Sequence, residues 1–157
     1  MKIHGQVISR MGVQTLVFPR DGDGRIVIRV APVVNYDAFD QLCPEPNVPF
    51  RMEPGKAATK NPENPEYKKA MDAWSEKRMN YMMIRSLEAT EGLEWETIDI
   101  QKPETWSLDK EMESTGFSAL EKARIMNAII LANGLNNDLI DEATKSFLAE
   151  AHQTPKL

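Results

Sequence analysis

The sequence predicts an α+β fold with an N-terminal antiparallel β meander, an extended Pro-rich arm, and a C-terminal helical region that contains a long helix and a helical hairpin. Three observations support this prediction. β-branched residues dominate positions 1–34, prolines gather within positions 35–65, and apolar residues recur at helical spacing through positions 66–157. At 157 residues, the meander and the helical region are expected to form one folded unit, with the central segment as an arm or linker.

Three short runs rich in β-branched residues are expected to form the strands of the meander. The first contains Ile3 and Val7-Ile8, the second runs from Val13 to Phe18, and the third runs from Ile26 to Val30. Arg10-Met11-Gly12 is a candidate for the tight turn between the first two strands. Short breaks between consecutive strands predict antiparallel pairing.

The break before the third strand, Asp21-Gly22-Asp23-Gly24, allows two interpretations. Two Asp-Gly pairs favour a hairpin turn, because both residue types tolerate a positive φ. Alternating carboxylates also begin an EF-hand calcium loop, but Arg25 and Pro32 stand where that loop needs oxygen ligands. A hairpin turn is therefore expected here rather than a metal site.

Seven of the ten prolines lie between Pro32 and Pro65. Proline fixes φ and lacks a backbone donor, so neither a regular helix nor a central strand is expected from Cys43 to Pro65. A helical turn at Tyr36–Leu42 is compatible with the proline spacing. Fully extended, the segment from Cys43 to Pro65 would reach roughly 70 Å. We therefore expect an arm that reaches beyond the domain it leaves.

The helical region opens with a long helix from Glu66 to about Thr90. Asn64 can cap this helix, Pro65 suits its first position, and Gly92 suits its end. Residues beyond it are expected to form a short strand and then a short helix. The strand spans residues 93–100 (LEWETIDI), and the helix runs from Ser107 or Asp109 toward Ser114.

Two further helices are expected at the C-terminal end. Ser118-Ala119-Leu120-Glu121 fits a capping box, so a helix with a wide apolar face is expected to begin there and run to about Asn133. After Asn136-Asn137, apolar residues from Leu139 to Ala151 recur at helical spacing. The short connection predicts that these two helices pack as an antiparallel hairpin.

Composition and charge exclude several classes of function. Apolar residues make up 41% of the chain and charged residues 27%, which is typical of a globular protein. With a net charge of −5 and scattered cations, nucleic acid is not an expected partner. No run is long enough to span a membrane, and Met1–Gly5 does not begin a secretory signal, so we expect no membrane partner and a cytosolic origin.

No catalytic, cofactor or metal site is expected. Cys43 lacks a helix start that would lower its pKa, and nothing in the sequence places it beside His4 or His152. Glu94 and Glu96 would share one face of a strand, which holds two carboxylates too close for most hydrolytic mechanisms. The sequence therefore predicts a protein that is not an enzyme.

Two groups of residues are candidates for binding a partner protein. One group lies in the arm, and the other is a Met-rich stretch of the long helix near Tyr81. Packing in the core is the favoured interpretation of these methionines. However, the long helix is apolar over more of its circumference than the predicted sheet and helical hairpin need to cover, so a partner surface is kept as the alternative. The candidate partner-binding residues are Phe50, Met52, Trp74, Met79, Met82 and Met83.

The helical region also carries a series of motifs in a particular order: Tyr67-x6-Trp74, Arg85-Ser86-Leu87, Trp95-Glu96, Pro103-Glu104-Thr105-Trp106, Gly116-Phe117-Ser118-x-x-Glu121, Asn133-Gly134-Leu135 and Phe147-Leu148. In this order, residues 66–150 resemble small structural or tail-assembly proteins of tailed bacteriophages. The resemblance implies a virion component or an assembly chaperone, found in the virion or the host cytoplasm, that binds itself or other phage proteins. It brings no catalytic residue to this chain.

The sequence thus leaves three functional hypotheses. The first is a non-catalytic phage structural or assembly protein that binds itself or neighbouring virion subunits, partly through the extended arm. The alternative is an adaptor or regulatory module that binds a host protein through the Met-rich helix. The third is an enzyme that uses Cys43 or the pair of Glu94 and Glu96.

Overall fold

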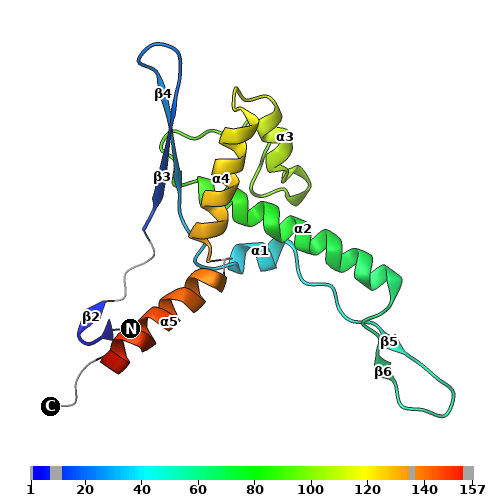
Figure 1. Ribbon diagram of the computed structural model, residues 1–157. Helices are drawn as coiled ribbons and strands as arrows, with labels where there is room; N and C mark the ends of the chain where they lie inside the picture. Colours follow the sequence, from blue (N-terminus) through cyan, green and yellow to red (C-terminus); the bar gives the residue numbers. More distant parts are fainter. Residues whose placement is uncertain (1, 8–11, 135–136, 154–157) are drawn as a thin grey trace.

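The computed structural model describes residues 2–7, 12–134 and 137–153. They form a mixed α+β body from which three projections extend (Figure 1). One projection is the tip of an antiparallel hairpin, the second is the arm together with the first half of the long helix, and the third is the C-terminal helix. The sequence-based prediction of an α+β chain with C-terminal helices is confirmed at this level.

The main hairpin pairs strand β3 (Gln14–Pro19) with strand β4 (Arg25–Val30). Side chains alternate between two faces, so that Phe18 and Ile28 point into the body while the other face stays exposed. The amide of Arg20 donates to the carbonyl of Gly24 at 2.8 Å and closes the connection. The expected hairpin turn at this position is therefore confirmed.

The first strand of the predicted meander does not join this hairpin. Strands β1 (Lys2–Ile3) and β2 (Gln6–Val7) instead pair with each other as a separate two-stranded hairpin. His4 and Gly5 have φ values of 50° and 78° and reverse the chain between them. The prediction of a three-stranded meander was therefore wrong, while Ile8 and most of the predicted turn at 10–12 lie outside the described residues.

Several predicted helix boundaries agree with the structure because local capping groups define them. The Asn64 side chain accepts from the amide of Tyr67 at 3.0 Å at the start of the long helix. Ser118 and Glu121 form both halves of a capping box. The helices are α1 (Asp37–Leu42), α2 (Pro65–Leu87), the 3-10 turn η1 (Pro103–Thr105), α3 (Leu108–Glu113), α4 (Ala119–Ala132) and α5 (Asn137–Gln153).

Residues 93–100 do not form the predicted strand. The carboxylate of Glu111 accepts from the amides of Glu96 and Thr97 at 2.7 and 2.8 Å, and it also accepts from the Thr97 hydroxyl. These amides are thereby satisfied by a side chain rather than by a neighbouring strand. The β-branched composition of the segment reflects its partial burial against the body instead.

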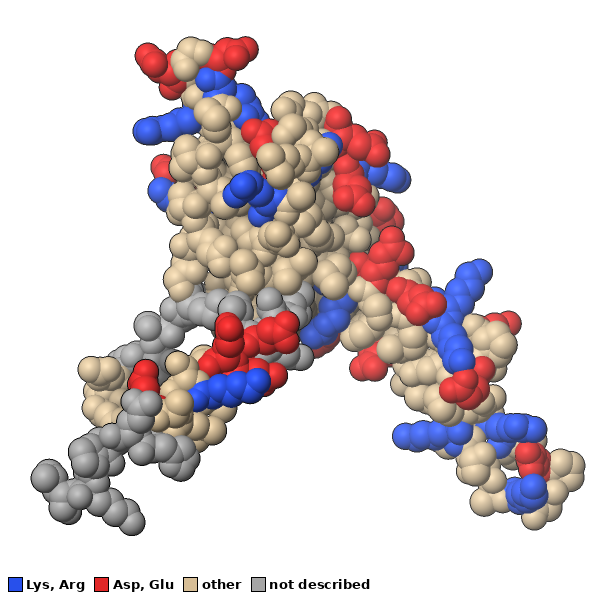
Figure 2. All heavy atoms as spheres, viewed as in Figure 1, with Lys and Arg blue, Asp and Glu red and all other residues tan. Residues whose placement is uncertain are grey.

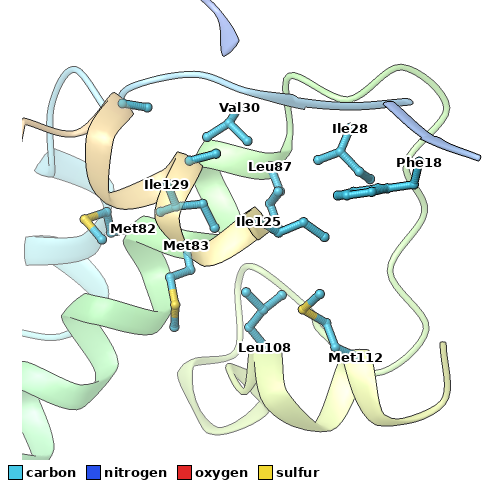
Figure 3. Close-up of a cluster of buried hydrophobic side chains, with 12 residues drawn as sticks. Phe18, Ile28, Val30, Met82, Met83, Leu87, Leu108, Met112, Ile125 and Ile129 are labelled. Carbon is cyan, nitrogen blue, oxygen red and sulfur yellow. The ribbon is translucent and has the colours of Figure 1, made fainter. Parts of the chain in front are cut away.

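The core of the body consists of two clusters. Figure 3 shows part of the larger cluster, in which side chains from β3, β4, α2, α3 and α4 converge. Its buried members are Phe18, Ile28, Val30, Met82, Met83, Leu87, Leu108, Met112, Ile125, Ala128, Ile129 and Ala132. The second cluster contains Phe39, Cys43, Tyr81, Ile84, Ile98 and Trp106.

Helix α5 does not pack beside α4 as a helical hairpin. It leads away from the body (Figure 1), and its described side chains from residues 140–150 are exposed. The buried apolar face of α4 packs against α2, β3 and β4 rather than against α5. The predicted antiparallel packing of the last two helices was therefore wrong.

Candidate partner-binding projections

The arm is held to the body by aromatic side chains at its root. The indole Nε1 of Trp74 donates to the carbonyl of Cys43 at 2.9 Å, and the Trp74 ring meets the Phe39 ring with a centroid separation of 5.7 Å. The guanidinium of Arg78 lies 4.1 Å from the ring centre of Tyr36 and within 3.9 Å of the Asp40 carboxylate. Trp74, predicted as a partner-binding residue, is thus half-buried and fixes the start of the arm.

The tip of the arm is a small antiparallel hairpin of β5 (Phe50–Arg51) and β6 (Thr59–Lys60). Its ends are drawn together because the amide of Asn61 donates to the carbonyl of Pro49 at 2.7 Å. The proline-rich segment therefore contains short strands, but no strand of the body pairs with them in the described residues. The arm is a defined structure with a turn at its end.

One face of this hairpin is apolar and exposed. The side chain of Phe50 is 63% exposed and that of Met52 is 78% exposed. Phe50 belongs to β5, and Met52 directly follows that strand, so the two exposed side chains lie two positions apart at the same end of the hairpin. Lys60 is directly opposite Phe50 across the strand pair, so these two side chains share one face of the hairpin. We call Phe50, Met52 and Lys60 the arm face.

The hairpin carries an excess of positive charge. Three cations, Arg51, Lys56 and Lys60, stand against one acid, Glu53, between residues 50 and 60. Glu53 accepts from Lys56 at 2.7 Å and lies 3.2 Å from Arg51. Lys60 has no acidic partner within the described part of the chain. Figure 2 shows blue side chains around this tip.

A groove of about 580 Å³ runs between the root of the arm and α2. Ala70 and Ala73 contribute small side chains from the helix, and Lys77 adds a cation at its wall. The groove is lined by Leu42, Cys43, Pro44, Pro46, Ala70, Ala73, Trp74, Lys77, Pro103 and Glu104. This groove is a concave, largely apolar surface on the same projection as the arm face.

The predicted Met-rich surface of α2 separates into two parts. Met79 is 47% exposed and faces solvent. Met82 and Met83 are buried in the larger core cluster, where they contact β-hairpin and helix residues (Figure 3). Core packing therefore accounts for Met82 and Met83, and they are not available to a partner.

Helix α5 presents an exposed apolar stripe. Ile140, Phe147 and Leu148 are 58%, 68% and 51% exposed, and their spacing of seven and eight residues places them on one side of the helix. Asp141 lies at the edge of this stripe, one position beyond Ile140 and seven before Leu148. Acidic residues outnumber basic ones in this helix, with Asp138, Asp141, Glu142 and Glu150 against Lys145. We call this side of α5 the α5 stripe.

Cys43 and His4, two of the residues considered for chemistry, belong to different parts of the described structure. Cys43 is buried, and burial raises the pKa of its thiol although Lys77 opposes the shift. His4 lies in the separate β1–β2 hairpin, and the side chain of His152 lies outside the described residues. No group of three potential metal-ligating side chains occurs in the described part of the chain.

Glu94 and Glu96 do not form a carboxylate pair on a strand, because that strand is absent. The buried acid of this region is Glu111. Burial acts to raise the pKa of Glu111, but hydrogen bonds from the Thr97 hydroxyl and from nearby backbone amides outweigh it and hold the pKa below its usual range. Its contacts assign Glu111 to fixing the loop at 93–100.

Comparisons with protein-family models, with curated proteins and with solved structures find no match for this chain. Among the described helices, none is both long and apolar enough to cross a membrane.

Sequence reasoning found the arm face but missed two surfaces. The apolar spacing of α5 was visible in the sequence, yet it was assigned to packing against α4. The groove at the root of the arm could not be found, because it depends on how Pro44 and Pro46 lie against α2. An excess of acidic residues beside the α5 stripe was the available signal that this helix is solvated.

Proposed function

We propose that the protein is a non-catalytic subunit or assembly factor that binds protein subunits, itself or neighbouring ones, through its projections. The observation that carries this proposal is the extent of its surface. A compact monomer of this mass would expose roughly 8,000 Å², whereas the chain exposes 12163 Å². An excess of this size is typical of a chain whose surfaces are covered in an assembly.

The position of the exposed apolar residues supports the same proposal. The two most exposed large apolar side chains of the arm, Phe50 and Met52, lie at its tip, and Phe147 lies on α5. Aromatic residues and methionine are enriched at protein interfaces and are seldom left exposed in number on a monomer. The arm is anchored by the contacts of Trp74, so its tip is presented in a defined direction.

The setting of a tailed bacteriophage, with the protein in the virion or the host cytoplasm, is part of this proposal and rests on the resemblance of residues 66–150. The alternative of an adaptor that binds a host protein through the Met-rich helix has less support, because Met82 and Met83 are buried. Catalysis by Cys43 is disfavoured by its burial and its raised pKa.

The test removes the tip of the arm and leaves its root in place. Residues 50–60 are replaced by two glycines, which can close the loop because Pro49 and Asn61 are hydrogen-bonded neighbours. The protein is produced together with the products of its neighbouring genes, and the size and composition of the complexes are measured by sedimentation. Loss of the complex is expected, with Thr59→Ser as the control, and an unchanged complex would reject the arm as a binding element.

A further inference from the structure

We propose that the partner of the arm face is the α5 stripe of a second copy of this chain, so that copies associate head to tail. This inference rests on the proposed function and names the partner for that same surface. The arm face contains Phe50, Met52 and Lys60, and the α5 stripe contains Ile140, Phe147 and Leu148 with Asp141 at its edge.

The two surfaces belong to separate projections. Figure 1 shows α5 and the β5–β6 hairpin leaving the body in different directions. They are not in contact within one chain, so a contact between them joins two copies. Because each copy contributes a different surface, such a contact is heterologous and produces a closed ring or an open chain rather than a symmetric dimer.

Charge favours this pairing over the two symmetric ones. The hairpin at residues 50–60 has an excess of cations, and α5 has an excess of acids. Pairing α5 with α5, or arm with arm, would bring like charges together, whereas pairing arm with α5 brings opposite charges together. Neither Lys60 nor Asp141 has an ion-pair partner within the described residues, so both are available for this contact.

Both elements would also gain stability from the contact. An isolated helix of this length is marginal in water, and so is an isolated two-stranded hairpin. Among the described residues, Ile140, Phe147 and Leu148 of α5 remain more than half exposed, and β5–β6 has only its own two short strands. Docking of one on the other buries Phe50 and Phe147 together and covers both unpartnered faces.

A competing acceptor for α5 exists on the outer face of the main hairpin. Val17 and Val27 pair across β3 and β4 there, near Arg25 and Arg29. Val27 is only 37% exposed, and Arg29 already lies 3.8 Å from Glu91. Val17 is 55% exposed, compared with 63% and 78% for Phe50 and Met52 of the arm face, and the two single variants distinguish these acceptors.

The experiment uses two full-length variants, Phe50→Ser and Phe147→Ser, and measures self-association by sedimentation velocity over a wide range of concentration. Both side chains are exposed, so both variants are expected to fold. Each variant alone is expected to self-associate at least about ten-fold more weakly than the wild type. The matched controls are Thr59→Ser on the opposite face of the hairpin and Ala149→Ser on the opposite side of α5, and both should associate as the wild type does.

Mixing the two variants provides the decisive result. Phe50→Ser retains an intact α5 stripe and Phe147→Ser retains an intact arm face, so an equimolar mixture is expected to form dimers that grow no further. A mixture that stays monomeric would overturn the proposal. So would a Phe50→Ser variant that still associates while Phe147→Ser does not, because α5 would then dock elsewhere.

The outcomes also separate this inference from the proposed function. A wild-type chain that stays monomeric at all concentrations overturns the head-to-tail contact, yet the proposed function stands if the tip deletion still abolishes binding of neighbouring subunits. Self-association that survives in both single variants likewise overturns the inference and leaves the protein a self-binding subunit.

Discussion

Helices α4 and α5 follow one another in the chain and have the same kind of apolar spacing, yet α4 has a buried apolar face and α5 an exposed one. Ile125 and Ile129 of α4 are 1% and 0% exposed, whereas Ile140 and Phe147 of α5 are 58% and 68% exposed. Helical periodicity therefore identifies an apolar face without saying which surface covers it. In α4 the cover is the chain itself, and in α5 we propose that it is another copy.

The same division runs through the molecule. The body holds the buried aromatic and aliphatic side chains, while the arm tip and α5 hold exposed ones. Substitutions in the body should therefore change the stability of the monomer, and substitutions in the projections should change association.

The largest effect on stability is expected from Ile129→Ala in α4. The side chain is fully buried in the larger cluster, so its loss removes apolar contacts and leaves a cavity, at a cost of about 2–5 kcal/mol in the free energy of unfolding. The matched variant Phe147→Ala in α5 should change it by less than about 0.5 kcal/mol. Urea denaturation at low protein concentration measures both, and equal losses would break the comparison.

Glu111→Gln is expected to lower the free energy of unfolding by about 1–3 kcal/mol at neutral pH, which is a smaller loss than that of Ile129→Ala. The hydrogen bonds of Glu111 lower its pKa in the folded state, so its contribution is complete above the pKa of the unfolded chain, roughly 4.3. The contribution is lost as the pH falls through the lower pKa of the folded state. The difference in the free energy of unfolding between wild type and variant should therefore narrow in acid, whereas the control Glu113→Gln, at an exposed position, should change it by less than about 0.5 kcal/mol at neutral pH.

Ser118→Ala at the start of α4 is expected to cause the smallest loss, about 1 kcal/mol in the free energy of unfolding. The Ser118 hydroxyl accepts from the amide of Glu121, and the carboxylate of Glu121 accepts in turn from the Ser118 amide and from Arg20 at 2.6 Å. Ser146→Ala, in the exposed middle of α5, has no such role and should not destabilise the monomer. Thermal unfolding measures the stability of both variants relative to the wild type.

The parts of the fold that were predictable are those that neighbouring residues determine. Asn64 caps α2, Ser118 and Glu121 begin α4, and the Asp-Gly pairs at 21–24 form a turn, all through contacts within a few positions. The failures are non-local. Residues 93–100 do not form a strand, and the Glu111 carboxylate, 14 to 15 positions further on, accepts from the amides of Glu96 and Thr97.

The candidate site shows the same limit. Phe50 and Met52 could be identified because prolines exclude them from regular elements of the body, so exposure was expected. The sequence could not show that Met82 is buried and Met79 exposed, because burial along α2 depends on where β4 and α4 pack. The apolar spacing of α5 predicts an apolar side of the helix, but it does not identify the surface that covers that side.

Hydrogen exchange of α4 and α5 at two protein concentrations tests the central claim most directly. In the body, protection of the α4 amides should be strong and independent of concentration, because the chain itself supplies the cover. Protection of the α5 amides should be weak in dilute protein and rise in concentrated protein, together with that of β5 and β6. Protection of α5 that equals that of α4 in dilute protein, or that does not change with concentration, would contradict the account.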